Sequence, residues 1–155
     1  MAKALVVFYT RTGTTKKLAE DIAKTLGTDI EEIIDTKDRK GAVGYLTAGR
    51  DAMQKRLTKI KPAKKDPANY DVVAIGTPIW GWAMTPAVRT YISQNSHKFK
   101  RVAFFCTMGG SGGMKAFAEM EKLLKKPLAV LELKTEEVKG GTHLEKVKEF
   151  CRKVK

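Results

Sequence analysis

Apolar residues in this chain fall into short continuous runs that alternate with segments of helical spacing. The run Ala4–Tyr9 is apolar throughout, as expected for a strand buried on both faces of a sheet. Leu18, Ile22 and Leu26 then repeat at the spacing of one helix face. Further strands are predicted at Asp29–Ile34, Asp71–Gly76, Arg101–Thr107 and Leu128–Leu133.

Helices are predicted between these strands. Pro86 stands at an early position of a helix over Thr85–Gln94, and a second helix covers Gly112–Lys125. Two more segments each show a helical apolar face, one made of Leu46, Gly49, Met53, Leu57 and Ile60, and the closing one of Leu144, Val147, Cys151 and Val154. Strands and helices thus alternate five times, which predicts an α/β fold with a parallel sheet covered on both faces.

The length of 155 residues suits a single domain over 1–155. In a parallel α/β sheet, ligands bind beyond the carboxyl ends of the strands, where the strand order reverses. Three chemically distinctive loops follow predicted strands: Thr10–Thr15, Thr77–Thr85 and Thr107–Gly113. We expect all three to meet at one edge of the sheet.

The first loop, Thr10–Thr15, reads Thr-Arg-Thr-Gly-Thr-Thr and leads from a strand into a helix. Its four hydroxyls and the unpaired N–H groups at the helix start suit a phosphate. The alternative is an ordinary threonine cap. The loop lacks the Lys of a nucleotide P-loop and is not a Gly-x-Gly-x-x-Gly turn, so a phosphomonoester cofactor held by neutral donors fits it best.

The second and third loops supply different chemistry. Trp80 and Trp82 flank a glycine directly after a buried strand, where exposed aromatic rings are costly unless they cover a flat ligand. The alternative for Trp82 is a lid over the core. The third loop is rich in glycine, so its backbone N–H groups can approach the polar edge of a heterocycle. A phosphate-binding loop, an aromatic ring that can stack on a flat ligand and exposed backbone N–H groups together match the parts of flavin mononucleotide (FMN).

The three loops, in this order, resemble those of the flavodoxin family. The matching motifs are Thr-x-Thr-Gly-x-Thr at Thr10–Thr15, Gly-x-Pro-Ile-Trp at Gly76–Trp80 and Thr-x-Gly-Gly-Ser-Gly at Thr107–Gly112. The resemblance implies a flavodoxin-like three-layer sandwich with a five-stranded parallel sheet of order 2-1-3-4-5 and noncovalently bound FMN. The uninterrupted fifth strand resembles the short-chain branch of the family.

The resemblance also implies roles for individual residues. The phosphate would be held by Thr10, Arg11, Thr12, Gly13, Thr14 and Thr15. Thr77, Pro78 and Ile79 would line the ribityl chain and ring, and Trp80 would stack on the isoalloxazine. Gly81 would lie near the flavin N5, in a turn that changes its hydrogen bond on reduction. Many flavodoxins have a second aromatic residue in the third loop, where this chain has Met108, so the outer face of the flavin would be either covered by Trp82 or open to a substrate. The pyrimidine edge would meet Thr107, Met108, Gly109, Gly110 and Gly112.

The charge of the chain departs from the usual acidic flavodoxin. The net charge is +13, and the stretch Lys37–Lys65 alone carries ten basic residues against Asp38 and Asp51, a net +8. We expect this stretch to dock acidic redox proteins, such as a ferredoxin or a reductase. The alternative is a solvated charged surface. No aromatic-rich basic groove accompanies the charge, so specific nucleic-acid binding is not expected.

Composition also bears on the location of the protein and on metal binding. No apolar run approaches the roughly 20 residues of a membrane span, and no signal peptide is recognisable, so we expect a cytoplasmic, monomeric protein. The two cysteines, Cys106 and Cys151, and the two histidines are too few and too scattered for a zinc or iron–sulfur site, so we predict no metal and interpret both thiols as small buried hydrophobes.

We compare three hypotheses for the function. The leading hypothesis is a low-potential one-electron carrier between redox proteins, which needs no catalytic acid, base or nucleophile, and none is evident in the three loops. The alternative is an FMN-dependent NAD(P)H:quinone reductase or a protoporphyrinogen dehydrogenase-like enzyme. A phosphorylated receiver domain would need carboxylates where this chain has Tyr9-Thr10 and Thr77-Pro78, so that class is excluded.

Overall fold

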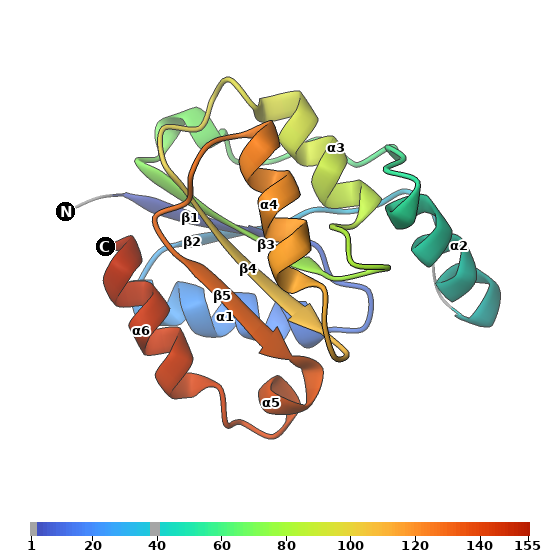
Figure 1. Ribbon diagram of the computed structural model, residues 1–155. Coiled ribbons are helices and arrows are strands. Elements are labelled where there is room, and N and C mark those ends of the chain that lie inside the picture. The colour runs from blue at the N-terminus through green and yellow to red at the C-terminus, as the bar shows by residue number, and fades with distance from the viewer. Residues whose placement is uncertain (1–2, 38–40) are drawn as a thin grey trace.

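The computed structural model describes residues 3–37 and 41–155. It contains a five-stranded parallel sheet in the order β2-β1-β3-β4-β5, which confirms the predicted topology (Figure 1). The strands are β1 (Ala4–Phe8), β2 (Asp29–Glu32), β3 (Val72–Pro78), β4 (Val102–Met108) and β5 (Val130–Lys134). The order reverses between β1 and β3, which places a topological switch point beside the first and second loops.

The helices are α1 (Thr14–Leu26), α2 (Gly41–Met53), α3 (Pro86–Asn95), α4 (Gly113–Leu123), α5 (Thr135–Lys139) and α6 (Leu144–Val154), with a 3₁₀ turn at Pro67–Asn69. The short helix α5 was not predicted. The predicted ends of the other elements differ from the observed ones by only a few residues, except in the second helix. In the described parts of the chain, no helix has the length and apolar character to cross a membrane.

Side chains that alternate along the strands build a core on each face of the sheet. Val6 and Phe8 of β1 point toward α1, α5 and α6, whereas Leu5 and Val7 point toward α3 and α4. The first core receives Val147, Phe150, Cys151 and Val154 from α6, and the second receives Ala87, Val88, Tyr91, Phe117 and Met120 from α3 and α4. The sheet is therefore covered on both faces, as parallel strands require.

Helix α2 corrects the prediction made from Leu46, Gly49, Met53, Leu57 and Ile60. The helix ends at Met53, Leu57 follows it outside any element, and Ile60 forms an isolated bridge with Asp35. Lys55 adopts a left-handed conformation (φ 56°), so the chain turns away soon after the helix. Because Lys is not a residue that commonly ends helices in this way, the sequence contained no clear stop signal.

Helix α2 presents several large apolar side chains to the outside. Among its described residues, the buried ones are small residues and one carboxylate: Gly44, Ala48, Asp51 and Ala52. Val43, Leu46 and Met53 are exposed to 78, 71 and 61%. Figure 1 shows that α2 lies at the periphery of the molecule, beyond α3.

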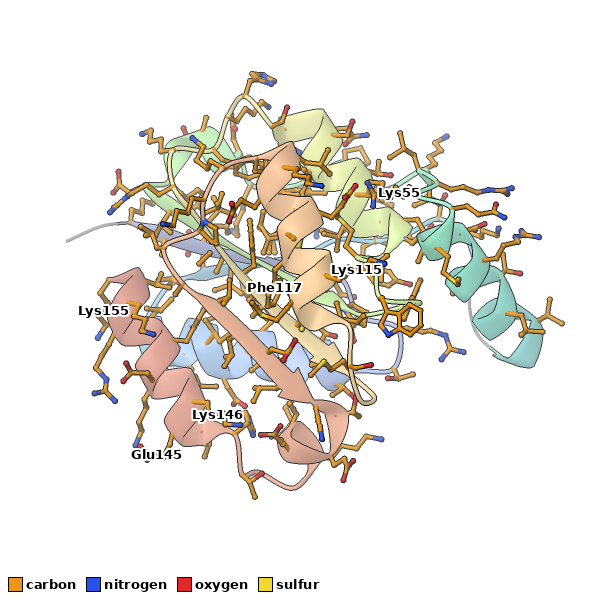
Figure 2. The ribbon with its side chains drawn as sticks, viewed as in Figure 1. Lys55, Lys115, Phe117, Glu145, Lys146 and Lys155 are labelled. Carbon is orange, nitrogen blue, oxygen red and sulfur yellow. The ribbon has the colours of Figure 1, made fainter. Side chains whose placement is uncertain are left out.

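Charged side chains hold α2 and the segment after it to the body. Asp51 is buried and lies within 3.2 to 3.7 Å of the cationic groups of Lys37, Arg50 and Arg56. Lys55, labelled in Figure 2, pairs with Glu119 of α4 at 3.3 Å, and the same carboxylate pairs with the buried Arg89 of α3 at 3.4 Å. These ion pairs join α2 and the residues after it to Lys37 and to α3 and α4.

Candidate functional site

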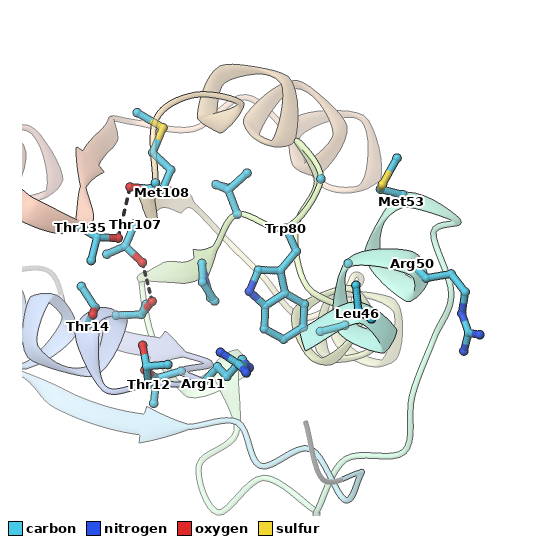
Figure 3. A pocket seen from close by; sticks show the side chains of 18 of the residues that line it. Arg11, Thr12, Thr14, Leu46, Arg50, Met53, Trp80, Thr107, Met108 and Thr135 are labelled. Atoms are coloured by element: carbon cyan, nitrogen blue, oxygen red, sulfur yellow. Dashed lines mark hydrogen bonds between the residues drawn. The ribbon is translucent and has the colours of Figure 1, made fainter. Parts of the chain in front are cut away.

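A pocket of about 770 Å³ lies at the carboxyl edge of the sheet. One side consists of hydroxyl-bearing residues of the first loop and their neighbours, and the other of apolar residues, as Figure 3 shows. The predicted site residues that line it are Thr10, Arg11, Thr12, Thr14, Thr15, Pro78, Ile79, Trp80, Gly81, Thr107, Met108 and Gly109. The structure thus brings all three loops to one place.

The first loop is shaped around Gly13. The Thr10 hydroxyl accepts a hydrogen bond from the Gly13 N–H at 2.9 Å, and Gly13 itself has a φ of 99°, which only glycine adopts easily. This turn leads directly into α1, whose start has no side-chain cap and no acidic residue in its first turn. The N–H groups of that first turn have no intrahelical partners, so they and the helix dipole favour an anion here.

Hydroxyl contacts join the first loop to the third. The Thr15 and Thr107 side chains are buried, and their hydroxyl oxygens lie 2.7 Å apart. Thr135, the first residue of α5, donates its hydroxyl to the Met108 carbonyl at 3.2 Å and also lines the pocket. Thr135 was missed from the sequence, although its position directly after β5 places it at the same edge of the sheet as the three loops.

The second loop folds into a tight hairpin. The Trp80 N–H donates to the Ala83 carbonyl at 3.0 Å, and the Ala83 N–H donates back at 3.1 Å. The two central residues, Gly81 and Trp82, both have positive φ (56° and 60°), as in the primed hairpin turns. The Trp80 ring is held edge-on against Tyr9, with centroids 5.7 Å apart, and lies in the pocket between the threonines and Leu46 (Figure 3).

Trp82 takes a different place from Trp80. It does not line the pocket; its indole N–H donates to the Ser111 hydroxyl at 3.2 Å, and the Lys115 ammonium lies 5.9 Å from the centre of its ring. A Cβ at Gly112 would collide with Trp82, so the second and third loops are in direct contact there. The ring is 56% exposed and therefore does not act as a lid over the core.

Other predicted residues support the pocket from behind. Thr77 is fully buried; its hydroxyl donates to the Pro78 carbonyl at 2.8 Å and accepts from the Thr85 N–H at 3.1 Å, so it fixes the second loop. Gly13 and Gly112 are the residues before α1 and α4, with φ of 99° and 103°. Like Gly110, they are absent from the pocket lining.

Helix α2 supplies a wall that sequence reasoning missed. The pocket is lined on this side by Leu46, Ala48, Gly49, Arg50 and Met53 of the helix and by Gln54, which follows it. Met53 also packs on Gly81, where a Cβ would collide with it. No motif marked these residues, because their spacing matches that of any helix face.

The electrostatics of the pocket favour an anion and offer no activated thiol. Arg11 and Arg50 line it, and none of its described lining residues is acidic. Cys106 lies beneath it in β4, where burial, with a smaller effect of Glu132, raises the pKa of the thiol to about 12. Cys106 therefore stays protonated at neutral pH, and Cys151 is likewise buried.

Comparisons with known proteins agree with this geometry. A flavoprotein from Lactobacillus acidophilus, crystallised in complex with FMN, is 23% identical and has a TM-score of 0.73 over 92% of this chain and 99% of its own. A protein described as a flavoprotein from Bacteroides uniformis is 25% identical, with a TM-score of 0.80 over 97% and 98% of the two chains. Flavodoxin 1 from Bacillus cereus is 16% identical, with a TM-score of 0.59 over 99% and 97%.

Among proteins with curated descriptions, none matches this sequence. A family model described as flavodoxin, in contrast, matches residues 3–153, which is nearly the whole chain. Together with the strand order 2-1-3-4-5, this match shows that the chain belongs to the flavodoxin family.

Proposed function

We propose that the pocket binds FMN and that the protein acts as a one-electron carrier between redox proteins. The observation that carries the proposal is the uncapped start of α1, surrounded by threonine hydroxyls, in the same pocket as the Trp80 ring. The phosphate would be held by the first loop, and the ring system would lie against Trp80. When bound, the flavin would accept and donate single electrons.

The donor set fits a phosphomonoester. Hydroxyls, backbone N–H groups and the guanidinium of Arg11 are all donors, and they converge at the helix N-terminus. The strained Trp80–Ala83 hairpin and the buried Thr77 hydroxyl hold the aromatic platform in a fixed orientation. The residues of the pocket would therefore bind and orient the cofactor, and the buried neutral Cys106 supplies no nucleophile.

Absorption spectroscopy tests the proposal. Purified protein reconstituted with FMN should show the flavin bands at a stoichiometry of one per chain, and stepwise anaerobic reduction should proceed through two separate one-electron stages. Failure to retain FMN after gel filtration would refute the cofactor assignment. A single two-electron stage would leave the cofactor in place and refute the role of one-electron carrier.

A reductase acting on a small planar substrate is the second candidate. The observation that favours it is the apolar side of the pocket, where Leu46 and Met53 stand exposed beside Ile79 and Trp80, while Trp82 is turned away. Steady-state oxidation of NADPH and NADH with a soluble quinone separates the two functions. Multiple turnovers per FMN would favour the reductase, and their absence would favour the carrier.

A further inference from the structure

The outer face of α2, which we define as Val43, Leu46, Arg50 and Met53, is an exposed surface that no described element of the chain covers. These positions are three, four and three residues apart, so they form one stripe along the helix. A fully buried aliphatic side chain is favoured over an exposed one, yet Val43, Leu46 and Met53 of this stripe are all largely exposed. A group of exposed apolar side chains is typical of a surface that meets another molecule.

The chain segment that carries this face is strongly cationic. Residues 41–65 include seven lysines and arginines and a single carboxylate, Asp51. Asp51 is buried on the opposite side of the helix and paired with three basic groups, so it presents no negative charge to a partner. An apolar centre within a charged rim is the usual composition of a protein interface.

We propose that the outer face of α2 is the docking site for an acidic one-electron carrier protein. This proposal rests on the proposed function, because Leu46 and Met53 belong both to the outer face and to the mouth of the pocket. A partner seated on α2 would therefore stand beside the cofactor site. Charge complementarity requires the partner to be acidic.

A second copy of this chain is a poorer occupant. A symmetric dimer across α2 would bring the same patch of each copy together, and the basic residues around it would face each other. Like charges opposed across an interface cost affinity. The dimer is an outcome of the experiment below.

Binding to a plant-type [2Fe–2S] ferredoxin, used as the acidic probe, tests the proposal. The FMN-loaded protein is titrated with oxidised ferredoxin in a calorimeter at about 0.01 M and about 1 M salt, where the Debye length falls from about 30 to about 3 Å. We expect binding at low salt that weakens strongly at high salt. No binding at low salt overturns the proposal.

Two variants separate the apolar centre from the charged rim. Val43 lines no part of the pocket, so Val43→Ser should leave FMN affinity unchanged and weaken ferredoxin binding about tenfold. The double variant Lys59→Gln, Lys61→Gln changes two exposed lysines of the same segment, and it should weaken binding at low salt and have little effect at high salt.

Matched controls lie on α6, on the other side of the molecule from α2 (Figure 2). Leu144→Ser removes an exposed apolar side chain there, and Lys148→Gln, Arg152→Gln removes two exposed basic side chains. These controls should bind ferredoxin like the native protein. Equal weakening by the variants on α6 and those on and after α2 would show that binding is not specific to the outer face of α2, and would overturn the proposal.

Sedimentation and flavin retention distinguish the other outcomes. If the protein sediments as a dimer that Val43→Ser dissociates, the occupant is a second copy and the proposal is wrong. Loss of FMN from the native protein would refute the proposed function. Retained FMN without ferredoxin binding would refute this inference alone.

Discussion

Removing hydroxyls from the first loop should weaken FMN binding far more than riboflavin binding. Thr12 and Thr14 line the pocket on the exposed side of the loop, so the double variant Thr12→Ala, Thr14→Ala removes two donors without opening the core. Thr15 is unsuitable for this test, because its loss would leave the buried Thr107 hydroxyl without its partner and would destabilise the fold.

The expected magnitude follows from the charge of the phosphate. A hydrogen bond to a charged group contributes about 1.5–3 kcal/mol, so two such bonds amount to about 3–6 kcal/mol. The dissociation constant for FMN should therefore rise about 10²-fold to 10⁴-fold. The contribution of the Thr12 hydroxyl should lie at the lower end of the range for one hydrogen bond, since water can replace an exposed hydroxyl. Riboflavin has no phosphate, and its affinity should stay nearly unchanged.

The measurement is fluorescence quenching of each flavin titrated with apoprotein. Thr28→Ala, at a half-buried threonine just beyond the far end of α1, is the matched control and should alter neither affinity. Urea unfolding of each variant checks that the fold is intact. An equal loss of affinity for FMN and riboflavin would refute the assignment of the first loop to the phosphate.

Three further predictions concern the platform, the core and an ion pair. Trp80→Ala should raise the fluorescence of bound flavin, whereas Trp82→Ala should leave it unchanged, since of these two residues only Trp80 lines the pocket. The reverse result would show that Trp82, and not Trp80, stacks on the flavin. Gly76→Ala should destabilise the protein by about 1–3 kcal/mol and lower its melting temperature, because its Cβ would overlap the ring of the buried Phe105, while Gly49→Ala, with open space around it, should be neutral or stabilising. Burial alone would raise the pKa of the Glu119 carboxyl, but Lys55 and Arg89 lower it below its usual value of 4.5. The paired carboxylate therefore stabilises the fold above pH 4.5, and this contribution is lost as the pH falls through the lowered pKa. Glu119→Gln should accordingly be less stable than the native protein at pH 7 and approach it in acid; a gap in urea stability that does not depend on pH would show that packing, and not charge, is responsible.

The sequence predicted most of the sheet and its ligand edge. Continuous apolar runs such as Ala4–Tyr9 identify buried strands, and the parallel topology then brings the loops after them together. Thr10–Thr15 and Trp80 could therefore be assigned to one site from the sequence alone. The structure confirms the strand order on which that reasoning depends.

Helix α2 could not be predicted in the same way. The spacing of Leu46 and Met53 marks one face of a helix but does not say whether that face meets the body or points outward. The distinction depends on how close the helix comes to its neighbours, which here favours Ala48 and Ala52 on the inner side. The end of the helix was not predicted, because Lys55 has a left-handed backbone conformation that glycine more commonly adopts. At the end of α1, by contrast, Gly27 has this conformation, and the glycine marks the helix end in the sequence.

The hydroxyl pair of Thr15 and Thr107 couples the two halves of the pocket through the direction of a single hydrogen bond. At 2.7 Å, one hydroxyl donates and the other accepts, and the buried pair has room for only one such arrangement at a time. An anion bound at the start of α1 would draw the Thr15 hydrogen toward itself, so Thr107 would then donate to Thr15. The Thr107 oxygen would thereby present its lone pairs toward the third loop. With FMN bound as proposed, the phosphate would therefore set the polarity of the site proposed for the ring, and inorganic phosphate should strengthen the binding of riboflavin in the native protein but not in a Thr107→Val variant.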